Sequence, residues 1–310
     1  MNPSTPETVS YLGPAGTFTH AAALAFAKAN DSLLALPSAV AVVRSVENDE
    51  ATTGVVAFES SLEGDVSLNL DELLLRTQHC LIADELILPV TFTVFRALGD
   101  ESPLIGVSSH LFALAQCSQF IESEGLQTRE TASTAAACLE LDQTPIPGWG
   151  ALAPPTAART YKLYTQIDFI ENEAGAVTRF VALRRTCAPA SGHDRSAFAV
   201  RPQRDEPGSL VRFLQEFAFH GVNLTAIKSH PTREALGEYV FYIECEGHIT
   251  QPRLRDVVTG ILRLQPQTRF LGSFPEDKAR PQQRDPHQGA LLQNLDSTYL
   301  QMLGRVKSRA

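Results

Sequence analysis

VSYLGPAGTFTHAAALAF, residues 9–26, predicts a strand, a tight turn and a helix in immediate succession. Val9–Leu12 is the expected strand, GPAGT the turn, and the helix runs through Leu24 and Phe26. The same alternation continues to residue 185. Further strands are expected at Gly54–Phe58, Leu104–Val107 and Gly150–Ala153, and helices at Val40–Asp49, Leu70–Leu75, Leu111–Glu122, Thr131–Asp142 and Pro154–Tyr164. This order predicts an α/β fold with mostly parallel sheets and ligands at the carboxyl ends of strands.

From residue 196 onward the expected order changes to βαββαβ, which predicts a small ferredoxin-like domain. Its expected strands are Ser196–Pro202, Leu224–Ser229, Glu238–Glu246 and Phe270–Phe274, and its helices are Gly208–His220 and Leu254–Leu262. The small and polar residues of Cys187–Arg195 predict the linker. We therefore expect one domain over 8–186, a second over 195–275, and a polar tail over 276–310 with a possible short amphipathic helix at Leu291–Leu303.

Composition limits the class of partner. The 310-residue chain is 44% hydrophobic and 20% charged, which is ordinary for a globular protein. Its formal net charge of −9 argues against non-specific binding of nucleic acid, which depends on basic surface. The first ten residues, MNPSTPETVS, do not resemble a signal peptide, and no stretch approaches the ~20 apolar residues of a membrane span. We expect a cytoplasmic protein without membrane contact.

The five cysteines are scattered and lack the spacing of a zinc site. They are expected to be free and mostly buried thiols. The chain also lacks the common nucleotide, phosphate-loop, zinc-protease and serine-hydrolase motifs, so an enzyme of this sequence is expected to need no nucleotide or metal cofactor.

Three expected strand ends share one chemistry. GPAGT places Gly13, Gly16 and Thr17 at a helix start, where backbone N–H groups and the helix dipole favour an anion. Glu59, Ser60 and Ser61 follow the second strand, and Ser108, Ser109 and His110 precede the helix at Leu111. Each stretch alone is more typical of a capped turn than of a binding site. Together they indicate a small ligand that bears carboxylates.

GAVTRFVALRR, residues 175–185, predicts a strand with one unusual residue. Alternation puts Arg179, Val181 and Leu183 on one face, and Thr178, Phe180 and Ala182 on the other. The arginine indicates either a strand end in solvent or a site that needs a cation beside a hydroxyl.

These residues carry a family resemblance. YLGPAGTFT, VVAFESSLEG, SSHLFALAQC and the Thr178–Phe180 TRF occur over residues 8–185 in the order found in the catalytic domain of prephenate dehydratase. PGSLVRFLQEFAFHGVNLTAIKSHPTR resembles the ACT regulatory domain that follows it in that family. The resemblance implies two α/β lobes like those of a periplasmic binding protein, with the active site in the cleft between them. It also implies conversion of prephenate to phenylpyruvate, with loss of water and carbon dioxide, for phenylalanine synthesis.

The resemblance also implies roles for single residues. Thr178 would donate a hydrogen bond or a proton to the departing hydroxyl. Arg179 would pair with a substrate carboxylate or brace the loops that do, and Phe180 would pack the strand against the cleft. The implied substrate-binding residues are Gly13, Gly16, Thr17, Glu59, Ser60, Ser61, Ser109 and His110. No cofactor or metal is implied.

The sequence departs from the family pattern at several of these positions. Ser60 replaces the asparagine of E-N-S, Ala15 and His20 replace acids of GPEGTFTE, and Leu111 replaces the proline of S-H-P. In the regulatory half, the family's G-A-L-V and E-S-R-P appear as Gly208-Ser209-Leu210-Val211 and Lys228-Ser229-His230-Pro231. These eight residues are the expected effector site, and Lys228 reverses a charge there.

The resemblance implies L-phenylalanine as the effector and a homodimer or homotetramer built through ACT domains. Two other functions remain open at the level of sequence. One is a prephenate decarboxylase that leaves the ring non-aromatic, which the altered E-N-S allows and the intact TRF disfavours. The other is a cytosolic small-molecule sensor without turnover.

Overall fold

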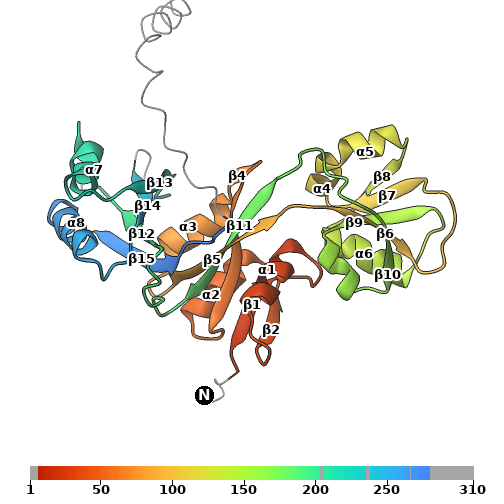
Figure 1. Cartoon of the computed structure of the whole chain (residues 1–310), viewed down its shortest axis with the longest axis horizontal. Helices are drawn as coiled ribbons and strands as arrows, with labels where there is room; N and C mark the ends of the chain where they lie inside the picture. Colours follow the sequence, from red (N-terminus) through yellow and green to blue (C-terminus); the bar gives the residue numbers. More distant parts are fainter. Residues whose placement is uncertain (1–5, 203–205, 235–237, 266, 280–310) are drawn as a thin grey trace, which may run out of the picture. The chain divides into compact units, whose positions relative to one another are not determined.

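The computed structural model describes residues 6–202, 206–234, 238–265 and 267–279. The predicted tail over 276–310, with its possible helix at Leu291–Leu303, therefore falls almost entirely outside the described residues. Up to residue 278 the chain forms one compact unit that contains three sheets. We call the parts built on the first two sheets lobe 1 and lobe 2, and the part built on the third sheet the C-terminal domain (Figure 1).

Lobe 1 contains a sheet of order β2-β1-β3-β11-β5, with the short β4 paired to β3. Its strands are β1 (Thr8–Leu12), β2 (Ser32–Leu36), β3 (Thr53–Ser60), β4 (Gly64–Asp65), β5 (Leu81–Pro89) and β11 (Val177–Arg184), and its helices are α1 (Phe18–Phe26), α2 (Ala39–Glu47) and α3 (Ser67–Arg76). β1 pairs in parallel with β2 and β3, whereas β11 runs antiparallel to both β3 and β5.

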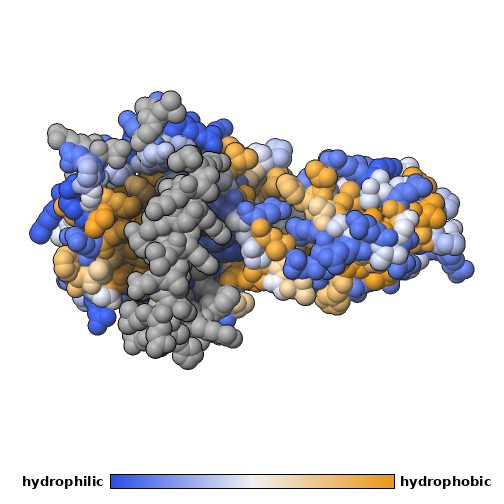
Figure 2. All heavy atoms as spheres, turned by 90° about the horizontal axis from the view of Figure 1, so that it is seen from above, coloured by the Kyte–Doolittle hydropathy of each residue, from blue (hydrophilic) through white to orange (hydrophobic). Residues whose placement is uncertain are grey.

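Lobe 2 contains a sheet of order β10-β6-β9-β7-β8. Its strands are β6 (Thr93–Ala97), β7 (Gly106–Ser109), β8 (Gln127–Glu130), β9 (Trp149–Ala153) and β10 (Leu163–Asp168), and its helices are α4 (Leu111–Gln116), α5 (Ser118–Ser123), α6 (Thr134–Gln143) and the 3-10 helix η1 (Pro155–Arg159). The exposed face of this lobe in Figure 2 mixes hydrophobic and hydrophilic residues, as a surface facing water normally does.

The chain crosses between the lobes twice, and the two crossing segments are paired. Val90 N donates to the Ala176 carbonyl at 2.8 Å, and Phe169 N donates to the Phe92 carbonyl at 3.0 Å. The first crossing joins β5 to β6 and the second joins β10 to β11. The predicted two-lobed α/β architecture is confirmed, and the two crossings place β11, with its TRF, next to the connection between lobes.

The C-terminal domain has the predicted βαββαβ order and the antiparallel sheet β13-β14-β12-β15. Its elements are β12 (Asp194–Val200), α7 (Ser209–Phe219), β13 (Leu224–Pro231), β14 (Tyr239–Glu246), α8 (Pro252–Leu264) and β15 (Thr268–Pro275). α7 and α8 bury apolar stripes that include Phe213, Phe217, Val257 and Ile261 against one face of this sheet.

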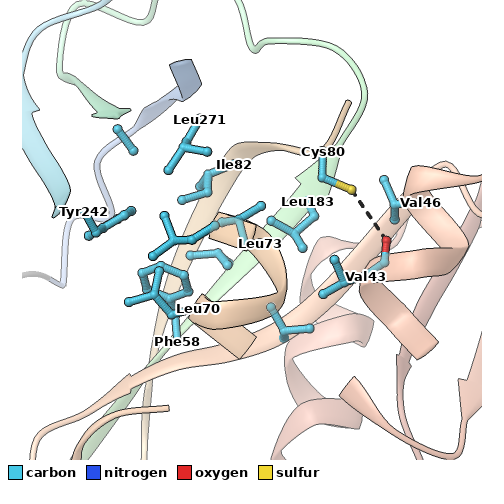
Figure 3. Close-up of a cluster of buried hydrophobic side chains, with 14 of the residues drawn as sticks. Val43, Val46, Phe58, Leu70, Leu73, Cys80, Ile82, Leu183, Tyr242 and Leu271 are labelled. Carbon is cyan, nitrogen blue, oxygen red and sulfur yellow. Dashed lines mark hydrogen bonds between the residues drawn. The ribbon is translucent and has the colours of Figure 1, made fainter. Parts of the chain in front are cut away.

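The other face of this sheet shares a hydrophobic core with lobe 1. Tyr242 and Leu271 of the C-terminal domain lie among Phe58, Leu73 and Ile82 of lobe 1, and all five are buried (Figure 3). The two domains expected from the sequence are therefore packed through a common core.

Gly272 shows how closely the two domains approach. It has φ +125°, and a Cβ at this position would lie 2.1 Å from the Ile82 carbonyl oxygen of β5. Only glycine has room here, because the backbones of β15 and β5 are in direct contact.

We therefore expect Gly272→Ala to destabilise the protein by more than the roughly 1–3 kcal/mol that an unfavourable φ alone costs. Gly192→Ala is the matched control, since Gly192 also has a positive φ (+96°) but nothing within 4 Å of its missing Cβ. Urea unfolding of both variants makes the comparison. Equal losses would contradict the close approach of β15 to β5.

Several predicted elements need correction. The sheets are mixed rather than mostly parallel, because strands on either side of the two crossings pair antiparallel. The helix predicted at Pro154–Tyr164 is the short η1 followed by β10, and the one at Leu111–Glu122 is divided at Cys117 into α4 and α5. β8 was not predicted, because its residues QTRE are polar and exposed throughout.

All five cysteines lie in the described residues and are free, as predicted. Burial raises the pKa of Cys80, Cys117, Cys138 and Cys245 to about 12, whereas Cys187 is half-buried. We therefore expect a thiol reagent at pH 8 to label one site quickly in the folded protein and five in denaturant. Mass mapping should place the fast label on Cys187, and fast labelling of a second cysteine would contradict the burial of these thiols.

Across the described residues, no helix combines the length and apolar character needed to cross a membrane.

Candidate active site

The hydroxyl-bearing strand ends of lobe 1 meet at one edge of its sheet. β1 and β3 are parallel, so the turn after Leu12 and the residues after Ser60 lie at the same carboxyl edge. β11 runs the opposite way, and Thr178 is the register partner of Ser60. The fold thus brings together the GPAGT turn, the serine pair and the TRF threonine, which are separated by up to about 165 residues in the sequence. We call this set of residues the lobe 1 edge.

Thr178 lies beside an irregularity in the strand pairing. Arg179 is the partner of Glu59 but Phe180 is the partner of Ala57, so Phe58 is an extra residue in β3. A bulge of this kind bends the strand locally and changes the direction of neighbouring side chains. Thr178 itself is half-buried at the end of β11.

Ser60 and Ser61 shape the hairpin between β3 and β4 and tie it to β11. Ser60 Oγ accepts from the backbone N–H groups of Leu62 and Glu63, both at 3.3 Å. Ser61 exchanges two hydrogen bonds with Val177: its N–H donates to the Val177 carbonyl, and its Oγ accepts from Val177 N, each at 2.9 Å. Because a hydroxyl that accepts can still donate, both serines keep an O–H hydrogen for a ligand oxygen.

The GPAGT turn is more fully bonded than predicted. The Gly13–Pro14 peptide is cis, Gly16 has φ +89°, and the Gly16 N–H donates to His20 Nδ1 at 3.0 Å. Thr17 is the N-cap of α1, where its Oγ1 accepts from His20 N at 3.2 Å. The Gly13 N–H also donates, to the Leu36 carbonyl at 2.9 Å, so neither glycine N–H is available to the anion that the sequence predicted at this turn. Burial lowers the pKa of His20, which favours the neutral ring that accepts this bond.

Tyr161 of lobe 2 contacts the same turn. Its hydroxyl donates to the Ala15 carbonyl at 2.9 Å, and its ring is so close to Gly16 that an added Cβ there would lie 2.8 Å from Cε2. Sequence reasoning missed this residue, because its stretch was expected to be a helix rather than the approach to β10.

Ser109 and His110 belong to lobe 2 and differ in exposure. Ser109 is fully buried, and its Oγ donates to the Leu152 carbonyl at 2.6 Å. Its hydroxyl therefore joins β7 to β9, and the prediction that it contacts substrate is not supported by this geometry. His110 is half-buried at the N-cap of α4, where Nδ1 accepts from Phe112 N at 3.4 Å and its ring lies 5.3 Å from that of Phe112.

Arg179 does not end in solvent. Its side chain is 5% exposed, its Nε donates to Glu85 Oε2 at 2.7 Å, and its Nη1 lies 2.7 Å from Glu244 Oε1 of the C-terminal domain. Glu85 and Glu244 are themselves fully buried, and the guanidinium lies over the rings of Phe58 and Phe274. Of the two roles predicted for Arg179, this geometry supports bracing and not direct pairing with substrate.

The charges around Arg179 keep it protonated. Burial by itself would lower the pKa of the guanidinium, but the carboxylates of Glu244 and Glu85 outweigh burial and raise it above its usual value. Glu244 also pairs with Arg195 at 3.2 Å and accepts a hydrogen bond from the Tyr242 hydroxyl. Sequence analysis missed Glu244. Its signal was a carboxylate inside the apolar strand EYVFYIECE, which needs a buried partner.

Phe180 points to the opposite face of β11, into a core with Val9, Tyr11, Ala22 and Val55. The predicted alternation along the TRF strand is therefore confirmed, since Val181 and Leu183 belong to the core on the Arg179 side. Phe180 therefore packs β11 against α1.

The predicted effector residues are divided between two environments. Gly208, Val211, Ser229 and Pro231 are exposed. Ser209 is buried and donates to the Glu206 carbonyl at 2.6 Å, and Leu210 packs on the core of the C-terminal domain. Lys228 and His230 face lobe 1 instead: Lys228 pairs with Glu59 and Asp65, and His230 Nδ1 lies 3.2 Å from Asp71 Oδ1. Alternation along β13 separates these two from Ser229, so the prediction that Lys228 and His230 belong to the effector site is not supported.

Among the described residues, no group of three or more His, Cys, Asp or Glu side chains could hold a metal ion. What the lobe 1 edge offers is the hydroxyl groups of Thr178, Ser60 and Ser61 as hydrogen-bond donors. Such groups can orient an oxygen-rich anion and donate to a leaving oxygen. Fold and site together define an α/β enzyme of two lobes with an additional C-terminal domain.

Comparison with known proteins identifies the family. Residues 9–188 match the model of the prephenate dehydratase family, and residues 203–261 match the ACT domain. The chain is 34% identical to the prephenate dehydratase of Amycolatopsis methanolica, over 86% of this chain and 88% of that one. It is also 34% identical to the bifunctional chorismate mutase/prephenate dehydratase of Aquifex aeolicus, over 86% of this chain and 73% of that one.

A solved structure agrees over nearly the whole length. The prephenate dehydratase of Arthrobacter aurescens in complex with L-Phe superimposes with a TM-score of 0.80 at 31% identity, covering 97% of this chain and 98% of that one. The chain therefore belongs to the prephenate dehydratase family. It is an enzyme of the lyase class, and its C-terminal domain is an ACT domain, as the resemblance predicted.

Proposed function

We propose that this protein converts prephenate to phenylpyruvate at the lobe 1 edge, with Thr178 as the donor to the departing hydroxyl. The observation that carries this proposal is the register pair of Thr178 and Ser60, which places the TRF threonine beside the serine pair and at the edge shared with the GPAGT turn.

The chemistry needs few groups. The bond from the ring to its carboxylate breaks and releases carbon dioxide, and the electron pair enters the ring. The bond from the opposite ring carbon to oxygen breaks, and the oxygen takes up a proton and leaves as water. Aromatisation provides the driving force, so the enzyme must hold a dianion and assist the leaving oxygen.

Different residues of this chain hold the substrate and assist the leaving oxygen. Thr178 donates a hydrogen bond to the leaving oxygen. Because an alcohol is a weak acid, the proton that this oxygen takes up is passed on through the threonine hydroxyl rather than lost from it. Ser60 and Ser61 donate to substrate oxygens, and Thr17, Glu59 and His110 complete the proposed binding set. Gly13 and Gly16 permit close approach of the backbone. Arg179 braces β11 from within.

Product identification tests the proposal. Purified protein is incubated with prephenate near neutral pH, and the product is identified by ultraviolet absorbance and mass. Phenylpyruvate is expected. A non-aromatic decarboxylated keto acid would replace the proposal with the decarboxylase alternative, and binding without turnover would replace it with a sensor.

We further propose that L-phenylalanine binds the ACT domain near Gly208, Val211, Ser229 and Pro231, the exposed members of the predicted effector site. The relative solved with L-Phe supports this choice of ligand. Calorimetry with millimolar phenylalanine should give a saturable heat of binding, and its absence would contradict the proposal. A homodimer or homotetramer, a cytoplasmic location, and domains over 8–186 and 195–275 stay predictions.

A further inference from the structure

Lys228 joins the ACT sheet to the hairpin that carries the serine pair. It lies on β13, its side chain is 14% exposed, and its ammonium lies 3.4 Å from Glu59 Oε2 and within hydrogen-bonding contact of Asp65 Oδ1. It also lies 5.9 Å from the centre of the Phe58 ring. The three residues that its ammonium contacts, Glu59, Asp65 and Phe58, all belong to β3 or β4.

The two carboxylates that Lys228 binds are register partners. Glu59 of β3 lies directly across from Asp65 of β4, and the next pair along is Ser60 with Gly64. Like charges directly opposite in an antiparallel pair repel and destabilise the pairing. Two cations lie near this pair: Lys228 contacts both carboxylates, and Arg179 Nη1 lies 3.8 Å from Glu59 Oε2. Lys228 is the one that bridges Glu59 and Asp65, and it therefore offsets their repulsion.

The hairpin is bonded in turn to the strand of Thr178. Ser61 exchanges two hydrogen bonds with Val177, and Thr178 is the register partner of Ser60. A hairpin that opens at Glu59 and Asp65 would therefore displace Ser60 and Ser61 relative to Thr178. Small displacements of substrate-orienting groups are costly, with effects up to about 10²-fold for roughly 1 Å.

We infer that Lys228, a residue of the ACT domain, is a positioning residue for substrate binding: it holds the β3–β4 hairpin closed so that Ser60 and Ser61 meet the substrate. The inference rests on the proposed role of the lobe 1 edge. It gives the reversed charge at this position a function, since Lys228 complements two acids of lobe 1.

Kinetics of charge variants test the inference on the full-length protein. For Lys228→Met we expect the KM for prephenate to rise about tenfold or more while kcat changes little, because binding groups are displaced and Thr178 is retained. Lys228→Glu should raise KM further, and Lys228→Arg should retain a near-normal value. A lysine that served stability alone would lower the amount of active enzyme, which reduces apparent kcat and leaves KM unchanged.

A charge exchange gives the decisive comparison. In K228E/D65K the ion pair is rebuilt with its charges reversed, and we expect its KM to fall back toward the wild-type value from that of Lys228→Glu. Arg201→Met is the matched control, because Arg201 pairs with Glu234 and Glu238 inside the ACT domain, and its KM should be unchanged.

The outcomes are distinguishable. Wild-type protein that does not consume prephenate would overturn the proposed function. Active wild-type protein together with a normal KM in Lys228→Met, or a double variant no better than Lys228→Glu, would overturn the role of Lys228 alone. If Lys228→Glu fails to fold, the Met and Arg variants decide the question.

Discussion

Thr178→Ala is expected to lower kcat by roughly 10²-fold or more, the range typical for loss of general acid assistance. The hydroxyl is the only polar group removed, and Phe180 and Arg179 keep the strand in place on its two faces. We therefore expect the melting temperature to change little. Steady-state rates of phenylpyruvate formation provide the measurement.

Thr178→Ser is the matched control, because it keeps the hydroxyl and removes a methyl group. Its kcat should stay well above that of the alanine variant. Near-normal turnover in Thr178→Ala, or equal losses in both variants, would remove the hydroxyl from its assigned role.

Arg179→Met is expected to destabilise the protein by about 3–5 kcal/mol, because it removes the cation that lies between the buried carboxylates of Glu85 and Glu244. The loss should appear as a lower urea midpoint. Arg185→Met is the control, since Arg185 is partly exposed and lies 3.8 Å from the exposed Asp49, and its loss should cost under about 1 kcal/mol.

A double variant separates charge from packing. Adding Glu244→Gln to Arg179→Met removes one of the two carboxylate charges that faced the lost cation, so the double variant should be less destabilised than the sum of the single variants. Strict additivity would contradict direct coupling between Arg179 and Glu244. A small loss in Arg179→Met itself would contradict the buried ion-pair network.

The fold was largely predictable because its signals are local. The strand, turn and helix at Val9–Phe26 and the alternation along residues 177–184 both depend on near neighbours in the sequence, and both agree with the structure. The order βαββαβ of the ACT domain follows from the same kind of signal. The polar strand β8 has no such alternation, since all four of its residues are exposed.

The candidate site was predictable in part, because motif residues mark strand ends but not the contacts between domains. The sequence indicated a cation at Arg179 without showing that its partners are Glu85 and Glu244, which lie 94 and 65 positions away. It indicated a reversed charge at Lys228 without showing Asp65 opposite. Ser109 has the residue type expected of a substrate-binding group, but its hydroxyl donates to the Leu152 carbonyl of the neighbouring strand β9.

These contacts change the view of the ACT domain in this chain. Lys228 forms an ion pair with Glu59, the residue before Ser60, and Glu244 forms one with Arg179, the residue after Thr178. The strands β13 and β14 that carry them are neighbours in one sheet. Ligands that shift this sheet therefore have a short physical connection to both strands of the lobe 1 edge.

The crystal structure of Thr178→Ala with prephenate tests the central claim most directly. The account predicts prephenate at the lobe 1 edge, with Ser60 or Ser61 donating to its oxygens. Its ring hydroxyl should lie within about 5 Å of the Cβ atom at position 178, since a threonine hydroxyl there would then reach it at hydrogen-bonding distance. Prephenate bound elsewhere, or bound with its ring hydroxyl turned away from position 178, would contradict it.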